Sequence, residues 1–419
     1  PPPPPLYNDP PPPEIYTDRN SSAASDVYKR QRLVTALGGL RITTASIERE
    51  FTDGATAIVR GALAGGCNFF AGYPITPASP ILMMMLRDLP ARGGIGMQGE
   101  DEMASIGMCI GAAMSGARAM TATAGPGISL YSENIGLALI GEVPLVIVDV
   151  QRLGPSTGAA TTTAQGDIQF VRWGTAGGFP IIALCPSTIA ECYTLTMKAF
   201  DLAERFRCPV FLMADKELAL TMRTVDPADY EDAVVRERPV IDPEDLDPPA
   251  EYRYEPPGEV VPMQLYGGKH PVRFTGSTHD QHAYITKQPE IVGPLNQHLI
   301  SKIDDHLDEI ALVDTDLEDG ANTLLAGYGV TAGSVREAVA AARAEGTKVS
   351  SITIQSLWPI PERQIRDAAS DVDRVVMAEL NPGLYKRELE RVLPDKEIVS
   401  IARTDGVLIS PSQLLEVIE

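Results

Sequence analysis

Cysteine is scarce in this 419-residue sequence, and its spacing excludes several kinds of site. No two of the five cysteines follow a Cys-x-x-Cys pattern, so the chain alone provides neither a zinc ribbon nor a ferredoxin-type cluster. Four of the five lie in apolar or small-residue segments, where a reduced thiol packs as a small hydrophobic group. We therefore expect no disulfide framework.

Positive charge and long apolar runs are also lacking. The 35 Lys and Arg residues are outnumbered by 56 Asp and Glu residues, a formal net charge of −21 that repels nucleic acid and anionic membrane surfaces. No apolar run approaches the roughly 20 residues that span a bilayer, and the N-terminal segment lacks the apolar core of a secretory signal. We expect a cytoplasmic protein with neither nucleic acid nor membrane as a partner.

A nucleotide-binding signature is absent as well. The sequence contains no Walker A motif, the glycine-rich loop that cradles nucleotide phosphates. His279 and His282 stand in the segment THDQH, but no third ligand lies nearby in the sequence. We therefore assign no metal ligands to this chain.

The length favours two or three domains, and composition divides the chain into four parts. Residues 1–46 carry nine prolines in the first 13 positions and little to bury, so we predict a disordered or non-native tail. Docking of this polyproline to an SH3-like groove is the alternative. Residues 226–303 are predicted to form an acidic, Pro-rich connector without a compact core, irregular to about residue 300.

Residues 47–225 alternate small-residue helices with short apolar runs, which is typical of buried parallel strands. The predicted strands are CNFFAGYP, ARAMTATAG, VPLVIVDV, FPIIALC and CPVFLMA, and the predicted helices are 77–89, 101–115, 129–140 and 188–205. This alternation predicts a doubly wound α/β domain. Residues 304–419 show four more strands with intervening helices and predict a second, smaller α/β domain.

Three segments that follow predicted strands carry candidate ligand-binding groups, at the end where α/β sheets bind ligands. Thr76 in GYPITP can cap the next helix, whose N-terminus can also bind a carboxylate. Arg152 in QRLGPSTG can form a fork onto a substrate carboxylate or can pair with a structural acid. The turn Gly125-Pro126-Gly127 allows close approach of the backbone to a ligand, although such turns are common.

Glu102 is a further candidate. It belongs to the segment GEDE at the start of a predicted helix, where acidic residues complement the helix dipole. The functional alternative is that one carboxylate points inward, to a cofactor nitrogen with which it shares a proton. The residues alone leave both interpretations open.

Taken together, these segments resemble one family. The order and spacing of GCNFFAGYPITPASPI, GEDEMASIGMCIGAAMSGARAMTATAGPG and VPLVIVDVQRLGPSTGAATTTAQGD resemble the α subunit of 2-oxoacid:ferredoxin oxidoreductases, particularly the 2-oxoglutarate type. The later segments NTLLAGYG, ITIQSLWPIPERQI and VVMAELNPG resemble the second domain of that subunit. The resemblance implies a pyrimidine-type thiamine diphosphate domain and a smaller domain similar to the C-terminal domain of transketolases.

The resemblance also implies roles for three residues. Glu102 matches the family's catalytic, cofactor-binding glutamate, whose carboxylate bonds the aminopyrimidine nitrogen and favours the imino form that removes the thiazolium C2 proton. Thr76 and Arg152 match groups that hold the carboxylate and carbonyl of the substrate. The implied reaction is the reversible conversion of 2-oxoglutarate and coenzyme A to succinyl-CoA, carbon dioxide and reduced ferredoxin.

Partners are implied by the same resemblance. A β subunit is expected to bind the diphosphate with Mg²⁺ and to carry a [4Fe-4S] cluster. This chain lacks a Gly-Asp-Gly motif with a downstream Asn, and it lacks cluster cysteines. The chain is expected to be inactive without that subunit. Ferredoxin is a further expected partner, and a γ subunit, where one is needed, would be a separate chain.

Three positions depart from the family pattern. Thr56 stands where relatives often carry Glu, Thr162 where Lys is common before QGD, and Leu384 where Gln is frequent after the E-x-N-x-G motif. A second cation would suit a dicarboxylate, so the absent Lys keeps a pyruvate or branched-chain 2-oxoacid substrate as an alternative. A non-catalytic α/β scaffold, in which Glu102 only marks a helix start, is the alternative from another class.

Overall fold

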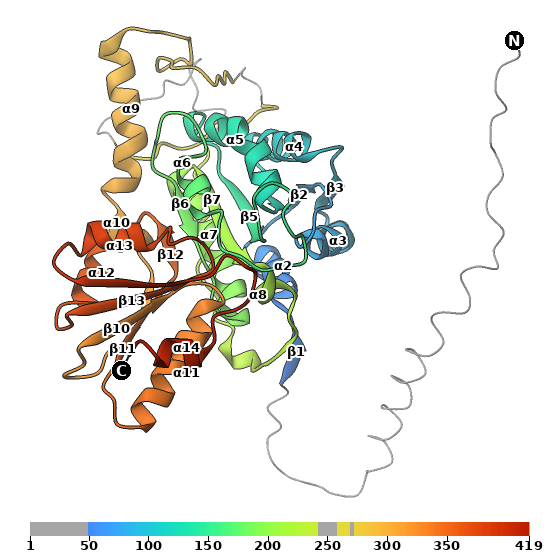
Figure 1. Cartoon of the computed structure of the whole chain (residues 1–419). Coiled ribbons are helices and arrows are strands. Elements are labelled where there is room, and N and C mark those ends of the chain that lie inside the picture. Colours follow the sequence, from blue (N-terminus) through green and yellow to red (C-terminus); the bar gives the residue numbers. More distant parts are fainter. Residues whose placement is uncertain (1–48, 242–257, 269–271, 419) are drawn as a thin grey trace, which may run out of the picture. The chain divides into compact units, whose positions relative to one another are not determined.

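The strands of the computed structural model form two sheets and one short ribbon (Figure 1). The structure describes residues 49–241, 258–268 and 272–418, which belong to one contact unit starting at Arg49. The predicted tail, residues 1–46, lies outside the described residues, as do residues 242–257 of the predicted connector. In the described ranges, no helix combines the length and the apolar character needed to cross a membrane.

The first sheet has seven strands in the order β12-β6-β7-β5-β4-β2-β3. Neighbouring strands pair in parallel, except that β12 is antiparallel to β6. Every residue of β4, β5 and β7 is buried, which explains why these strands appear in the sequence as continuous apolar runs. The strands are β2 (Phe69–Gly72), β3 (Ile95–Gln98), β4 (Ala119–Thr123), β5 (Leu145–Gln151), β6 (Ile182–Leu184), β7 (Pro209–Asp215) and β12 (Ser356–Trp358).

The five strands predicted in this part are confirmed, and β3 is an additional one. It lies at the sheet edge, is largely exposed and contains a glycine, so it lacks the apolar run that marks its neighbours. The associated helices are α2 (Gly54–Ala64), α3 (Ser79–Asp88), α4 (Glu102–Met114), α5 (Gly125–Ile140), α6 (Ile168–Trp173), α7 (Ile189–Phe206) and α8 (Lys216–Leu220). The α5 helix begins four residues earlier than predicted, so the Gly-Pro-Gly segment is its first turn rather than a turn before it.

The second sheet has the strand order β14-β13-β10-β11-β9. The four predicted strands are confirmed as β10 (Thr323–Gly327), β11 (Ser350–Ile354), β13 (Arg374–Glu379) and β14 (Glu397–Ala402). The fifth, β9 (Val313–Asp316), is antiparallel and mostly exposed, with two acidic residues in four, so its sequence carries no apolar signal. The helices of this part are α10 (Leu307–Ile310), α11 (Thr331–Ala344), α12 (Glu362–Ala368), α13 (Lys386–Val392) and α14 (Pro411–Leu415).

The segment after β8 (Arg223–Val225) runs without helix or strand to residue 239, apart from one 3-10 turn, and contacts α7. The Arg238 guanidinium pairs with the Glu204 carboxylate at 2.7 Å, and both side chains are nearly buried. The Tyr193 hydroxyl donates to Asp232 at 2.5 Å. These contacts show that the beginning of the acidic segment wraps the surface of a helix and is not a freely solvated linker. The β8 strand itself pairs with β1 (Glu50–Thr52).

The prediction of an irregular segment up to about residue 300 is wrong, because α9 (Pro289–Asp304) occupies its end. Two prolines, at the helix start and at position 294, hide this helix from a reading of the sequence. Polar contacts fix it: His298 Nε2 and Lys302 Nζ lie 2.8 and 3.0 Å from Glu142 Oε1. Although burial alone would raise the pKa of Glu142, the Lys302 charge and the hydrogen bond with His298 hold it well below its usual value.

Candidate active site

The candidate residues lie where four neighbouring parallel strands end. The strands β5, β4, β2 and β3 are consecutive in the sheet, so their carboxyl ends meet at one edge, where open α/β sheets bind ligands. The segments that follow β2 and β3 are joined by a hydrogen bond from the Gly99 N–H to the Gly72 carbonyl at 2.9 Å. Glu102 follows β3, Thr76 follows β2 and Arg152 follows β5.

Glu102 is the first residue of α4, and its side chain is the buried one among the three acids of that helix start. The residue is 7 % exposed, whereas the next residue, Met103, is 50 % exposed. The cap of the helix is made by Asp101, whose carboxylate accepts from the Ala104 N–H at 2.7 Å. Capping therefore leaves Glu102 free for another role, and within the described ranges no hydrogen bond engages its carboxylate.

The first turn of α5 lies against Glu102. A Cβ placed on Gly127 would be 2.9 Å from Glu102 Cγ and 1.9 Å from Thr123 Oγ1, so only glycine allows this close approach. Behind this turn, the Tyr131 hydroxyl shares a hydrogen bond with Thr121 Oγ1 at 2.8 Å. Burial raises the pKa of Tyr131 above its usual value, and the charge of nearby Glu102 adds to the effect. The glycine-rich turn thus forms one wall beside a buried carboxylate.

Thr76 and Arg152, predicted separately, are brought into contact by the fold. The Arg152 Nη1 group donates to the Thr76 carbonyl oxygen at 2.5 Å, and its Nη2 group donates to the Thr157 carbonyl at 3.0 Å. The Thr76 side chain is exposed and does not cap α3, because that helix begins at Ser79 with no side-chain cap. The capping interpretation of Thr76 is therefore wrong.

Arg152 is only 6 % exposed, and hydrogen bonds to the main chain hold its side chain in place. The fork is occupied by two backbone carbonyls, neither of which carries a formal charge. The acid that faces it is Asp167, whose pKa the Arg152 charge helps to lower against the stronger, opposite effect of burial. The two alternatives considered for Arg152 are thus not exclusive: a structural acid lies nearby while the guanidinium stays at the strand ends.

Two acids near these residues were missed in the sequence. Asp149 lies inside β5 and is fully buried, and Asp167 directly precedes α6. The available signal was an acid in the otherwise apolar run VPLVIVDV, because charged side chains are rarely buried without a partner. Gln165, in the segment AQGD, was also missed as an anchor.

Gln165 fastens the loop between Arg152 and Asp167 to the C-terminal part of the chain. Its backbone N–H donates to the Leu380 carbonyl at 2.9 Å, and its Oε1 accepts from the Leu380 N–H at 3.0 Å. Its Nε2 donates to the Tyr328 carbonyl, and its own carbonyl accepts from Asn381 Nδ2 at 2.8 Å. The E-x-N-x-G segment therefore holds the loop that follows Arg152.

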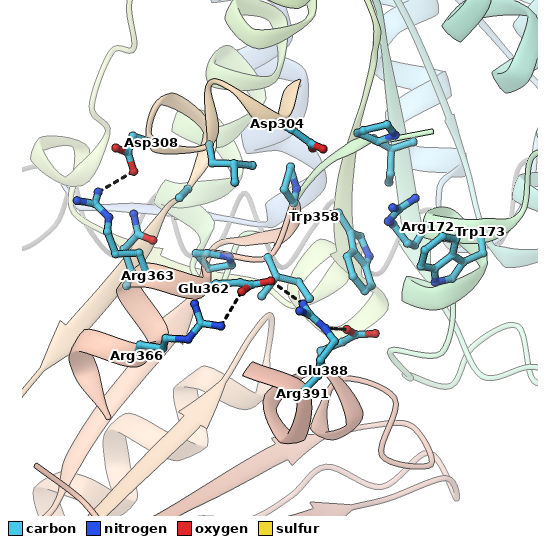
Figure 2. Close-up of a pocket in the computed structure, with 18 residues that line it drawn as sticks. Arg172, Trp173, Asp304, Asp308, Trp358, Glu362, Arg363, Arg366, Glu388 and Arg391 are labelled. Carbon is cyan, nitrogen blue, oxygen red and sulfur yellow. Dashed lines mark hydrogen bonds and ion pairs between the residues drawn. The ribbon is translucent and has the colours of Figure 1, made fainter. Parts of the chain in front are cut away.

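A separate cavity of about 880 Å³ lies among α6, α10, α12 and α13 (Figure 2). Its charged wall is internally paired. Arg366 and Arg391 each lie 2.8 Å from Glu362, and Arg363 lies 2.7 Å from Asp308. Neither Glu102, Thr76 nor Arg152 lines this cavity, so it is distinct from the site at the strand ends.

Comparison with known proteins decides the family. The family model described as pyruvate flavodoxin/ferredoxin oxidoreductase, thiamine diphosphate-binding, matches residues 60–291, which is more than half of the chain. The chain belongs to the 2-oxoacid:ferredoxin oxidoreductase family. A second model, pyruvate:ferredoxin oxidoreductase core domain II, matches residues 321–414. The predicted resemblance, the α/β fold class and the enzyme class are thereby confirmed.

Relatives of this oxidoreductase subunit include the 2-oxoglutarate synthase subunit KorA of Methanothermobacter marburgensis, at 39 % identity over 88 % of this chain and 98 % of the relative. The ketoisovalerate oxidoreductase subunit VorB of Methanothermobacter thermautotrophicus is 32 % identical over 88 % of this chain and 96 % of its own length. A solved structure, the 2-oxoglutarate:ferredoxin oxidoreductase from Magnetococcus marinus with 2-oxoglutarate, coenzyme A and succinyl-CoA bound, is similar with a TM-score of 0.82. It is 28 % identical, and the match covers 94 % of this chain and 70 % of that one.

Proposed function

We propose that this chain is the α subunit of a thiamine diphosphate-dependent 2-oxoacid:ferredoxin oxidoreductase that converts 2-oxoglutarate and coenzyme A reversibly to succinyl-CoA, carbon dioxide and reduced ferredoxin. The observation that carries the proposal is the buried Glu102 carboxylate, left free because Asp101 caps the helix. Similarity to KorA over nearly the whole of that subunit supports 2-oxoglutarate as the substrate.

The described residues suit the pyrimidine end of thiamine diphosphate. The Glu102 residue is only 7 % exposed, and its carboxylate has no hydrogen-bond partner among the described residues, so it can accept a bond from a ligand at the strand ends. When bound, thiamine diphosphate supplies the nucleophilic carbon and the electron sink that decarboxylation of a 2-oxoacid requires. Glu102 would hold a proton at the aminopyrimidine nitrogen, and the dry wall around Tyr131 would strengthen that interaction by excluding water.

Thr76 and Arg152 would bind the substrate. Two loop carbonyls fix the position of the Arg152 guanidinium, so it can attract a substrate carboxylate without a large loss of side-chain entropy. The exposed Thr76 hydroxyl is free to donate to the carbonyl or carboxylate of the same substrate. These two groups would orient the 2-oxoacid, while Glu102 acts on the cofactor.

A β subunit would complete the enzyme by binding the diphosphate and Mg²⁺ and by carrying a [4Fe-4S] cluster for electron transfer to ferredoxin. All five cysteines of this chain are buried, and burial raises the thiol pKa of Cys109 and Cys208 to about 12, so neither is a ready thiolate ligand. A γ subunit, where one participates, would be another chain, and a cytoplasmic location is part of the same proposal.

Reconstitution with the β subunit tests the proposal, with turnover followed as reduction of ferredoxin that depends on 2-oxoglutarate and coenzyme A. Glu102→Gln should abolish nearly all turnover, by about 10²-fold or more, because general acid–base groups of this kind contribute that much. Glu100→Gln, a change of an exposed acid two residues earlier, is the matched control and should leave turnover unchanged. Full activity of Glu102→Gln would refute the catalytic role.

The second candidate is a pyruvate or branched-chain 2-oxoacid enzyme of the same architecture. This candidate is supported by the similarity to VorB and by the threonine at position 162, where relatives commonly carry a lysine that would suit a dicarboxylate. A substrate panel of 2-oxoglutarate, pyruvate and 2-oxoisovalerate distinguishes the candidates by kcat/KM. The proposal requires 2-oxoglutarate to be preferred.

A further inference from the structure

Two carboxyl groups meet next to Arg152 and have no part in the function proposed above. Asp149 is fully buried within β5, and Asp167 immediately precedes α6. Asp149 and Gln151 are two residues apart and so share one face of β5, and Gln151 Oε1 accepts from the Asp167 N–H, which brings both carboxyl groups into one cluster. In the described part of the chain, no group donates to either carboxyl oxygen of Asp149 or to Oδ2 of Asp167.

The surroundings of this pair are tightly packed. A Cβ on Gly125 would lie 2.8 and 3.0 Å from the two carboxyl oxygens of Asp167, so the first turn of α5 closes directly over that group. The Asp167 N–H donates to Gln151 Oε1 at 3.3 Å. Gln151 itself is fully buried, and its Nε2 finds no acceptor among the described residues. The pair is therefore held in place by neighbouring elements and is not a mobile surface feature.

A proton between the two carboxyl groups explains this arrangement. Two carboxylates are acceptors only and repel each other, and a buried carboxylate with no donor is costly. Burial raises the pKa of Asp149 well above its usual value. Burial also raises the pKa of Asp167 to about 6, against the opposing hydrogen bond from Asp149 and the charge of Arg152. Near neutral pH, Asp149 is therefore the protonated donor and Asp167 the charged acceptor.

The only cation that faces the pair within the described residues is Arg152. Its terminal nitrogens are bonded to backbone carbonyls, and its Nε has no acceptor in the same residues. The first turn of α5 brings no ionisable side chain. The neighbouring strand β7 ends in Asp215, whose carboxyl oxygens accept from the N–H groups of Leu218 and Val330. The charge beside Arg152 therefore depends on the protonation of Asp167.

We propose that Asp149 and Asp167 form a proton-sharing pair that sets the charge beside Arg152 and makes the binding of an anionic 2-oxoacid depend on pH. The proposal rests on the substrate role proposed above for Arg152. When Asp167 is ionised its negative charge opposes the attraction of the substrate carboxylate to Arg152, and when Asp167 is protonated this opposition is lost. By linkage, binding of the anion draws a proton onto Asp167.

The test is the KM for 2-oxoglutarate of the reconstituted complex, measured from about pH 5.5 to about pH 8. The KM of the wild type should rise by about threefold to tenfold as the pH passes through about 6, because Asp167 loses its proton. Asp167→Asn should keep the low KM at every pH, since two carbonyls still hold Arg152. Asp149→Asn retains a donor to Asp167 and should keep the wild-type profile. Asp149→Leu removes the donor, so the rise should move to higher pH.

A wild-type profile in Asp167→Asn would overturn this proposal while leaving the proposed function intact. If the wild-type complex instead turns over no 2-oxoacid at any pH, the proposed function fails. The pair is then judged by carboxyl ¹³C NMR titration of the full chain, where a resonance titrating near pH 6 should vanish in Asp167→Asn. Persistence of that resonance would overturn the pair. If Asp149→Leu does not assemble into the complex, the KM profiles of Asp149→Asn and Asp167→Asn decide whether the proposal holds.

Discussion

The guanidinium of Arg152 donates a hydrogen bond to the carbonyl oxygen of Thr76, a residue 76 positions earlier in the chain. The two residues follow β5 and β2, strands that flank β4 in the sheet. This hydrogen bond joins the loops after β2 and β5 across the carboxyl end of β4. The β4 strand leads into the glycine-rich first turn of α5, which lies beside Glu102. Each candidate group is positioned by a different strand, and the sheet brings them to a common edge.

Shortening the fork of Arg152 should weaken substrate binding. In Arg152→Lys, a single ammonium cannot bond both loop carbonyls as the planar guanidinium does, so the KM for 2-oxoglutarate should rise by about tenfold or more. The thermal unfolding temperature should fall only slightly. Steady-state kinetics with the reconstituted complex checks this, with Arg92→Lys at an exposed position as the control. An unchanged KM would remove Arg152 from the substrate site.

Adding one methyl group at Gly127 should displace Glu102. A Cβ there would approach Thr123 Oγ1 to 1.9 Å and Glu102 Cγ to 2.9 Å, so Gly127→Ala should lower kcat strongly and destabilise the chain by about 1–3 kcal/mol. The control is Gly107→Ala on α4, where a Cβ would meet no atom within 4 Å. That variant should be neutral or slightly more stable. Equal behaviour of the two alanine variants would contradict the close packing described here.

Removing the amide of Gln165 should loosen the loop between Arg152 and Asp167. Gln165→Leu leaves the buried Leu380 N–H without its acceptor, which should cost about 1–3 kcal/mol, whereas the Tyr328 carbonyl still accepts from the Thr331 hydroxyl at 2.7 Å. Urea unfolding measures this as a lower midpoint at constant slope. Gln288→Leu, at an exposed position, should leave the midpoint unchanged. A midpoint unaffected by Gln165→Leu would show that this anchor adds no stability.

The buried Glu142 should make stability fall in acid. Its pKa is lowered in the folded chain, so its contribution is present above the ordinary value of 4.5 and is lost as the pH falls below it. Glu142→Gln should be less stable than the wild type at neutral pH, by about 3–5 kcal/mol, because Lys302 keeps a buried charge without its counter-ion. The difference should begin to shrink below about pH 5 and should continue to shrink as the pH falls further towards the lowered pKa of Glu142. Urea unfolding at several pH values checks this, and a pH-independent difference would contradict it.

The pattern of apolar residues alone was sufficient to predict most of the buried strands of this protein. Fully buried parallel strands require continuous apolar runs, and those runs located five strands of the first sheet and four of the second. The edge strands β3 and β9 were not predicted, because largely exposed strands do not need a continuous run of apolar residues. The α9 helix was not predicted because prolines stand at its start and in its interior, and because its polar contacts with Glu142 link residues more than 150 positions apart in sequence.

Residue type and order also pointed to Thr76 and Arg152, which follow predicted strands, and to Glu102, which stands at the start of a predicted helix. Only the tertiary structure decided what each side chain does there. It assigned the helix cap to Asp101, joined Arg152 to Thr76, and buried Asp149 against Asp167. These outcomes depend on distances between loops that are far apart along the chain, and such distances are set by strand order and helix packing, which no local pattern of residues contains.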